Sequence, residues 1–184
     1  MDDIVRRSET KTRNAFRPLG ERWFRPLLFL YLVLIVAHFA EHVLQLIQAA
    51  VLSWPRAEAG GLLGLWTPQL LTNESLHFSY NLMQLVGLLV LSYHVTGRAR
   101  TWWRIAIAVQ LWHFFEHFLL QSQWLTDIFL FNAARQTGVG ELLLPRLELH
   151  FIYNALVFVP TIIGAYFYMR DQMSELNNII TPRK

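Results

Sequence analysis

Apolar residues gather in four long stretches of the chain that are separated by more polar segments. The stretches cover residues 24–54, 75–96, 102–121 and 147–169. Each one approaches the roughly 20 residues that an α-helix needs to cross a bilayer. The pattern therefore predicts an all-α fold, namely an integral membrane four-helix bundle in which consecutive helices form two hairpins.

Polar segments at both ends and between the stretches predict how the chain is organised. Residues 1–22 predict a cytoplasmic N-terminal arm, and residues 173–184 predict a cytoplasmic tail. Residues 23–98 and 99–172 predict the first and the second transmembrane hairpin. The two long connections, at about 55–74 and 122–146, then lie on the opposite side of the membrane.

Basic residues are distributed unevenly around these stretches. Seven of the 16 Lys and Arg residues lie in the first 25 positions, three surround the turn at 97–104, and three follow the fourth stretch. The two long connections share the remaining three. Because basic flanks remain in the cytoplasm, we expect both termini on the cytoplasmic side of a plasma membrane of bacterial type.

Composition supports the membrane class and limits the chemistry. Hydrophobic residues make up 54% of the 184 positions and charged residues only 16%, below the roughly 25% of soluble domains. The chain has no cysteine, so any metal must take nitrogen or oxygen ligands. The basic residues flank apolar runs instead of forming a basic stripe, which argues against a nucleic-acid partner and leaves membrane lipid as the expected one.

An internal repeat carries the polar residues of the apolar stretches. The pattern HFxEH occurs at 38–42 and again at 113–117, and the pattern LHFxYN occurs at 76–81 and again at 149–154. The copies are 75 and 73 residues apart. The chain is therefore predicted to contain two related hairpins with a pseudo-two-fold relation.

Helical spacing places the polar residues of each motif on one face, because residues three and four apart are neighbours. Lipid cannot satisfy such groups, so the polar faces are expected to meet inside the bundle. At 1.5 Å per residue His38 lies about 20 Å into the membrane, and the other motif histidines fall at the same level in its outer half. His94 lies about 25 Å from that level and is excluded from the site.

These residues predict one site with two metal ions, each held by three histidines and bridged or capped by glutamates. The glutamates and two tyrosines are also the catalytic candidates, two asparagines are expected to orient ligands or hold water as cofactor-binding residues, and three glutamines are expected to line the approach. The metal ligands are His38, Glu41, His42, His77, His113, Glu116, His117 and His150; the catalytic candidates are Glu41, Glu116, Tyr80 and Tyr153; the asparagines are Asn81 and Asn154; the glutamines are Gln45, Gln48 and Gln121.

Two resemblances bear on the chemistry. The HxxEH string in each half resembles the inverted zinc-peptidase motif, in which two histidines bind zinc and the glutamate activates water. The density of histidines resembles the membrane-bound diiron desaturases and hydroxylases in ligand logic, although no HxxHH box occurs in the chain. The first resemblance implies zinc hydrolysis, and the second implies oxygen activation.

The leading hypothesis is an oxygen-activating oxidoreductase with two iron ions, acting on an apolar or amphiphilic substrate from the bilayer or the outer face. Zinc and copper remain possible ions. A zinc-dependent membrane hydrolase is one alternative. A metal- or haem-binding electron-transfer subunit of a larger complex is another, although histidines at i and i+4 on one helix cannot ligate opposite faces of one haem. A purely structural hydrogen-bonded network also remains open. A redox role requires an external electron-donor protein.

Overall fold

The computed structural model describes the backbone of residues 2–67 and 73–180 and the side chains of residues 22–67 and 73–174. Within these ranges the chain is all-helical and has no β-strand, which confirms the predicted all-α class. The helices are α1 (Asp2–Ala50), α2 (Gly61–Trp66), α3 (Glu74–Ser92), α4 (Gly97–Thr126) and α5 (Arg146–Ile180). Two short 3-10 helices, η2 (Leu130–Asn132) and η3 (Gly140–Leu142), lie between α4 and α5.

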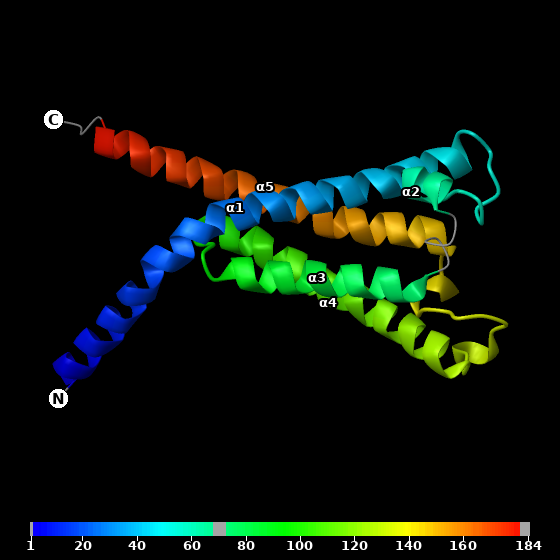
Figure 1. Ribbon diagram of the computed structural model, residues 1–184, viewed down its shortest axis with the longest axis horizontal. Coiled ribbons are helices and arrows are strands. Elements are labelled where there is room, and N and C mark those ends of the chain that lie inside the picture. The colour runs from blue at the N-terminus through cyan, green and yellow to red at the C-terminus, as the bar shows by residue number, and fades with distance from the viewer. Residues whose placement is uncertain (1, 68–72, 181–184) are drawn as a thin grey trace.

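The long helices α1, α3, α4 and α5 lie side by side (Figure 1). Helix α4 shares its broadest interfaces with α3 and α5, whereas α1 packs mainly on α5 and much less on α3. The turn between α3 and α4 lies at the same end as the chain termini, and the connections that carry α2, η2 and η3 lie at the other end (Figure 1). The connections therefore alternate between the two ends of the long helices, and the division into two hairpins stays a prediction.

Local signals in the sequence account for the helix boundaries. The side chain of Asn73 caps α3 by accepting a hydrogen bond from the backbone N–H of Leu76 (3.0 Å), which satisfies one of the free donors of the first turn. Gly97 begins α4 at a positive φ of 56°, a conformation that glycine adopts without strain. Asp127 ends α4 in the left-handed region with φ 52°.

The predicted boundaries of the arm and the tail fall inside helices. Helix α1 runs without a break from Asp2 through the predicted boundary at residue 22. Helix α5 continues through residue 173 to Ile180, and residues 181–184 of the predicted tail lie outside the described residues. The helical backbone therefore extends beyond the apolar stretches at the terminal end.

Three helices in the described ranges are long and apolar enough to cross a membrane, over Arg22–Ala50, Glu74–Ser92 and Arg146–Ser174. The fourth predicted span, α4, has the length but is less apolar because it carries Gln110, His113, Glu116 and His117. These four side chains are at most 4% exposed. Since they face neighbouring helices, they need not meet lipid, and the crossing by α4 stays a prediction.

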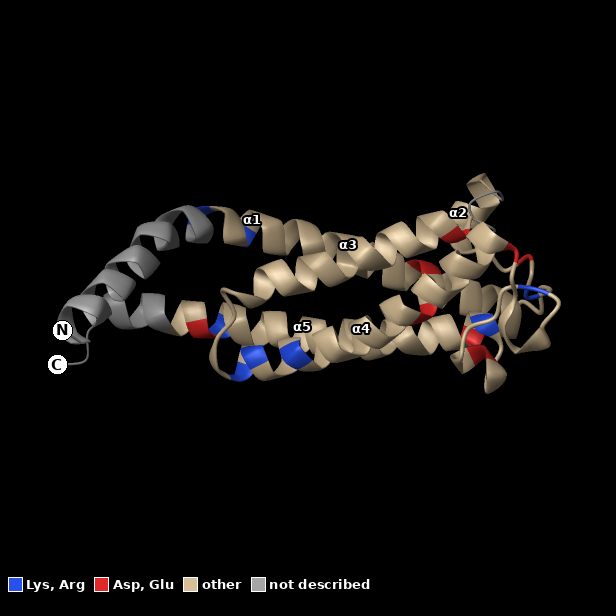
Figure 2. Ribbon diagram, turned by 90° about the horizontal axis from the view of Figure 1, so that it is seen from below, with Lys and Arg blue, Asp and Glu red and all other residues tan. Residues whose placement is uncertain are grey.

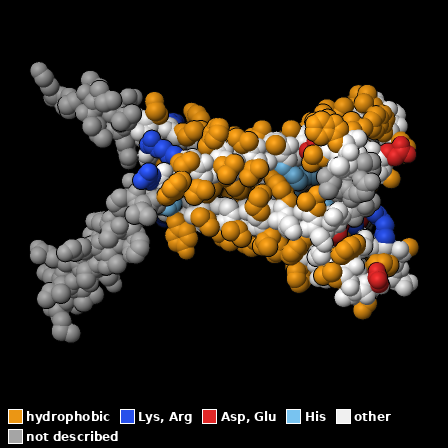
Figure 3. Space-filling model, in the orientation of Figure 1, with side chains coloured by type: hydrophobic (Ala, Val, Ile, Leu, Met, Phe, Trp, Pro, Cys, Tyr) orange, Lys and Arg blue, Asp and Glu red, His pale blue; other side chains and the backbone are white. Residues whose placement is uncertain are grey.

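Apolar side chains fill the interior at the terminal end and also cover the flanks of the long helices (Figure 3). The buried cluster brings together residues of α1, α3, α4 and α5, among them Tyr31, Ile35, Leu88, Trp103 and Val157. Charged residues of both signs lie toward both ends of the described part of the molecule (Figure 2). The buried polar residues therefore lie between the apolar interior at the terminal end and the opposite end of the molecule, which we call the outer end.

Candidate metal centre

Six histidines from four helices meet near the outer end of the structure. The ring of His42 on α1 lies 6.1 Å from that of His150 on α5, and the ring of His77 on α3 lies 6.1 Å from that of His117 on α4. The predicted convergence at one level is confirmed. His94 packs on Phe24 at a ring distance of 4.9 Å, away from this cluster as predicted.

Three of these histidines could form a metal-binding group. Ligand atoms of His113, His117 and His150 all lie within 4.8 Å of one another. His113 and His117 are each 1% exposed, and His150 is partly buried. Among the residues that the structure describes, this is the group of three that comes close enough to share an ion.

The hydrogen bonds of His117 and His150 determine which ring nitrogens face each other. The Nδ1 atom of His150 lies 2.8 Å from the backbone oxygen of Arg146, and the Nδ1 atom of His117 lies 3.3 Å from the Oε1 atom of Glu74. A carbonyl and an ionised carboxylate only accept, so both Nδ1 atoms donate and both Nε2 atoms carry lone pairs. The two Nε2 atoms are 3.2 Å apart.

Two lone pairs at this distance cannot form a hydrogen bond between neutral imidazoles. A tetrahedral ion with ligand bonds of about 2.0–2.1 Å holds two nitrogens about 3.3 Å apart, close to the observed spacing. A cation between them would turn a repulsive contact into two favourable bonds. The tautomers and the spacing therefore both suit a metal ligand pair.

His113 supplies a second reason to expect an ion in this group. Both of its ring nitrogens are buried and have no hydrogen-bond partner within the described ranges. Its ring lies 4.9 Å from the ring of His117 and 5.8 Å from that of His150. A buried unsatisfied polar group costs about 1–3 kcal/mol, and coordination would satisfy one nitrogen of His113.

The corresponding histidines of the first half are arranged differently. The Nε2 atoms of His38 and His42 are 3.0 Å apart, and His42 Nδ1 donates to Gln45 Oε1 at 2.9 Å. His38 can therefore donate its Nε2–H to His42, so this pair is satisfied without an ion. His77 holds the backbone oxygen of Asn73 through Nδ1 (3.0 Å), and its ring lies parallel to that of His117.

The structure directs both predicted glutamate ligands to the backbone of the outer loops. Glu41 Oε1 accepts a hydrogen bond from the N–H of Leu63 in the first turn of α2 (2.5 Å). Glu116 Oε1 accepts from the N–H of Gly140 at the start of η3 (2.9 Å). Free N–H groups in a first helical turn attract carboxylates, so these contacts fasten the outer loops. The predicted ligand and catalytic roles of the two glutamates stay predictions.

Two glutamines fasten the same loops, a role that the sequence analysis missed. Gln48, predicted to line the approach, accepts from the N–H of Gly61 (2.7 Å) and donates to its carbonyl (3.2 Å). Gln123 makes the same pair of contacts with Thr137, at 3.2 and 3.0 Å. Gln48 and Gln123 are 75 residues apart, as are Glu41 and Glu116. That equal spacing was the available signal.

The predicted tyrosines lie beside histidines in both halves. The ring of Tyr80 stacks on His38 at 3.8 Å, and the ring of Tyr153 lies 5.1 Å from that of His113. The hydroxyl of Tyr80 donates to the backbone oxygen of Leu34 (3.4 Å), and that of Tyr153 accepts from Trp112 Nε1 (2.9 Å). These contacts position the rings, and a catalytic role for either hydroxyl stays a prediction.

The predicted asparagines bond to histidine backbones, not to imidazole rings. Asn81 Nδ2 donates to the carbonyl of His77 (3.0 Å) and Asn154 Nδ2 to that of His150 (2.8 Å). Each asparagine thus braces the helical turn that carries a histidine. Of the three glutamines predicted to line the approach, Gln45 lines the pocket, whereas Gln121 donates to Ser75 Oγ at 3.0 Å.

Glu74 is a site residue that the sequence analysis did not select. Its Oε1 atom faces His117 Nδ1, and its Oε2 atom lies 3.5 Å from a guanidinium nitrogen of Arg146. The repeat offset of 73 residues pairs Glu74 with Leu147. Glu74 therefore orients an imidazole of the second-half group, an interaction that commonly supports metal-ligating histidines, and its repeat equivalent Leu147 has no carboxylate to do the same in the first half.

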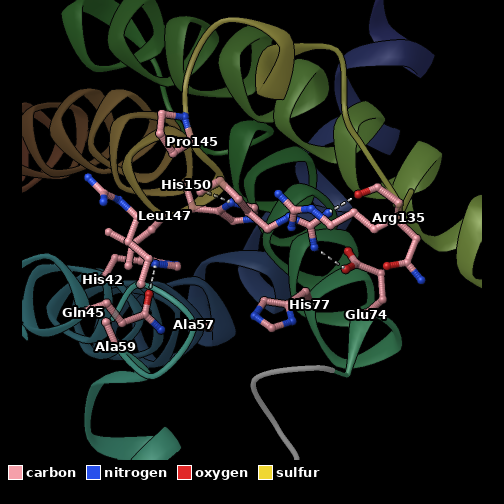
Figure 4. A pocket seen from close by; sticks show the side chains of 13 residues that line it. His42, Gln45, Ala57, Ala59, Glu74, His77, Arg135, Pro145, Leu147 and His150 are labelled. Carbon is pink, nitrogen blue, oxygen red and sulfur yellow. Dashed lines mark hydrogen bonds and ion pairs between the residues drawn. The ribbon is translucent and has the colours of Figure 1, made fainter. Parts of the chain in front are cut away.

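An open pocket of about 520 Å³ reaches the histidines from the outer end. His42, His77 and His150 face it from three different helices, with Glu74 beside them (Figure 4). The remaining lining residues are Gln45, Arg56, Ala57, Ala59, Arg135, Gln136, Pro145, Arg146 and Leu147. A small ligand therefore has a route to the imidazoles from this end of the molecule.

Comparisons with known protein families, with curated proteins and with solved structures find no match to this chain. The function is therefore inferred from the site itself.

Proposed function

We propose that the chain is a membrane metalloenzyme that binds an ion through His113, His117 and His150. The observation that carries this proposal is the pair of Nε2 atoms 3.2 Å apart whose Nδ1 partners leave both with lone pairs. In this proposal α4 crosses the membrane with α1, α3 and α5, and the four helices form a bundle. Its outer half holds the ion.

A second ion is proposed between His38, His42 and His77. The ring of His42 lies 6.1 Å from that of His150, which makes the two histidine groups direct neighbours. Binding there requires His38 to give up its hydrogen bond to His42 and His77 to turn toward α1. The second-half ion is therefore expected to bind more tightly than the first-half ion.

The leading reaction class is oxygen activation with iron, supplied with electrons by an external donor protein. Imidazole ligands suit iron, and neighbouring histidine groups suit two ions. Three protein ligands leave coordination positions open, as in catalytic metal sites, and the pocket at His150 gives an exchangeable ligand access to them. An electron carrier needs no such pocket, which favours an enzyme.

Zinc hydrolysis is the second candidate, favoured by the absence of a carboxylate from the group of three imidazoles. Three histidines with an open fourth position are a known catalytic zinc arrangement. Glu41 and Glu116 hold loop backbone, so neither is placed as the general base. Glu74, which lines the pocket, would have to take that role.

Elemental analysis of protein purified in detergent tests the metal centre, with His113→Ala as the variant. His94→Ala is the matched control, because His94 packs on Phe24 outside the cluster. We expect stoichiometric metal in the wild type and in the control, and loss of the second-half ion in His113→Ala. Wild-type metal content in His113→Ala would refute the proposal.

Optical spectroscopy of the same samples separates the two reaction classes. An iron protein reduced with dithionite is expected to be reoxidised by dissolved oxygen with a change in absorbance. Stoichiometric zinc without iron or copper would exclude the oxidoreductase and leave the hydrolase.

A further inference from the structure

The pocket above the histidines has a polar, mainly cationic wall. Its charged lining residues are Arg56, Arg135 and Arg146 against the single carboxylate of Glu74. Its lining residues come from the ends of α1, α3 and α5 that lie opposite the chain termini and from the connections at that end. A molecule that reaches the histidines by this route comes from water.

The arginines are more exposed than the carboxylates that pair with them. Arg56 is 64% exposed and its partner Glu148 is 26% exposed. Arg135 is 66% exposed, whereas its partner Glu141 is 4% exposed. The positive ends of these ion pairs therefore face the pocket and the solvent, and the negative ends are withdrawn.

The inner end of the pocket adds to this positive field once a metal is bound. His150 belongs both to the pocket wall and to the group of three ligands. Neutral imidazoles leave the charge of a divalent ion uncompensated, and Glu74 is already shared between His117 and Arg146. An ion in this place favours an anionic ligand with oxygen atoms.

We propose that the pocket admits a small water-borne oxyanion, such as a carboxylate, from the face opposite the termini, and that this anion is the class of substrate for the metal centre. The assignment as substrate rests on the proposed function. Access and charge selection rest on the arginines alone. A polar substrate replaces the apolar one expected from the membrane setting.

Single-cysteine labelling tests the pocket, because the chain has no cysteine of its own. Leu147→Cys and Ala57→Cys each place a thiol in the lining, and the second serves if the first fails to fold. Leu143→Cys is the control, at an 85% exposed position of the same end that does not line the pocket. The probes are membrane-impermeant methanethiosulfonates carrying a sulfonate or a trimethylammonium group.

We expect the ratio of the labelling rates, sulfonate reagent over ammonium reagent, to be about tenfold higher at Leu147→Cys than at Leu143→Cys. This factor is the lower end of rate enhancement by electrostatic steering. Arg56→Gln with Arg135→Gln should remove most of this preference. Equal rates, or a preference for the cationic reagent, would overturn the inference.

Protection by acetate connects the pocket to the ion. Acetate should slow labelling of Leu147→Cys in the metal-loaded protein and do so less in a protein that also carries His113→Ala. Equal protection in both would refute the metal-bound anion. A preference for the sulfonate reagent in a protein that binds no metal would refute the proposed function and support the anion-selective pocket. Stoichiometric metal with equal labelling rates would support the proposed function and refute the anion-selective pocket.

Vesicle composition distinguishes a free anion from a lipid headgroup. Protection by acetate should be the same in phosphatidylcholine vesicles and in vesicles with phosphatidylglycerol. Slow labelling that occurs only with phosphatidylglycerol would identify a lipid phosphate as the occupant and refute the water-borne anion.

Discussion

The two halves of this protein share their fastening contacts and differ in their histidine groups. In each half a glutamate and a glutamine, separated by seven positions, hold the backbone of the outer loop that follows their helix. His77 and His150 each donate Nδ1 to the carbonyl four residues earlier. Yet, among the residues that the structure describes, only those of the second half bring three ligand atoms within 4.8 Å of one another.

Helix packing explains the difference. Helices α4 and α5 share a broad interface, whereas the corresponding pair, α1 and α3, is in much looser contact. His113 and His117 therefore meet His150, while the ring of His77 lies 6.1 Å from that of His117 in the other half. A duplicated motif supplies the same ligands twice, but the distance between helices decides whether they can share an ion.

Replacing the equivalent histidines of α3 and α5 one at a time should give the largest difference in metal content between the two halves. His150→Ala removes one of three converging ligands and should abolish binding of the second-half ion. Loss of a group that only hydrogen-bonds to a metal ligand already lowers metal affinity about 10–100-fold, and loss of a ligand itself should cost more. His77→Ala should retain that ion. Metal-to-protein ratios of the two purified variants measure the effect, and equal losses would show that the halves are not different.

Glu74 offers the next contrast because its repeat equivalent is Leu147. Glu74→Leu makes the two halves alike and removes the acceptor that orients His117, so affinity for the second-half ion should fall about 10–100-fold. Competition with a chelator of known affinity provides the measurement. Glu58→Gln, a change at an exposed loop carboxylate, is the control, and unchanged affinity in Glu74→Leu would exclude the positioning role.

Removing the loop-fastening glutamates should affect stability and leave the metal in place. Glu116→Ala strands the buried N–H of Gly140, at a cost of about 1–3 kcal/mol in the free energy of unfolding. Glu41→Ala should cost less, because its bond to Leu63 is exposed to solvent.

Thermal unfolding in detergent, followed by metal analysis of the folded fraction, checks both glutamate variants. Loss of metal from a folded Glu116→Ala protein would return this carboxylate to the set of ligands. A larger destabilisation in Glu41→Ala than in Glu116→Ala would contradict the difference in burial.

Replacing the loop-fastening glutamines should give the most local effects, which hydrogen exchange resolves by position. Gln48→Leu loses both bonds to Gly61, and Gln123→Leu loses its bonds to Thr137 and Leu130. At about 0.5–1.5 kcal/mol for each bond, exchange at Gly61 and at Thr137 should quicken by about tenfold or less for each bond lost. Unchanged protection at these amides would mean that the loops are held by other contacts.

Much of the fold could be predicted because helices of this length and apolarity have few alternatives in lipid. The four helices, the shared level of six histidines and the separation of His94 all followed from counting residues along a helix. The span in α4 stays a prediction, since its buried Gln110, His113, Glu116 and His117 lower its apolar character. Polar residues that face neighbouring helices lower the mean hydropathy of a segment. They add no cost of contact with lipid, because they do not face it.

The residue roles could be predicted less well, because a helical face points toward several partners. Glu41 and Glu116 lie on the same turns as histidine ligands, yet each reaches a backbone N–H of a loop that only the folded chain brings near. Glu74 lies outside both motifs and was overlooked. It became a candidate for orienting His117 because α3 packs along α4.

The sequence by itself determined which residues lie on one face of each helix and at which depth, because the helical rise and period are constant. It therefore indicated the duplication, the histidine level and the end of the molecule that carries the site. Tertiary structure decided which histidines come within reach of one ion, where the carboxylates bind and how the pocket opens. Those outcomes depend on distances between helices and on loop positions, which the local pattern of a chain does not encode.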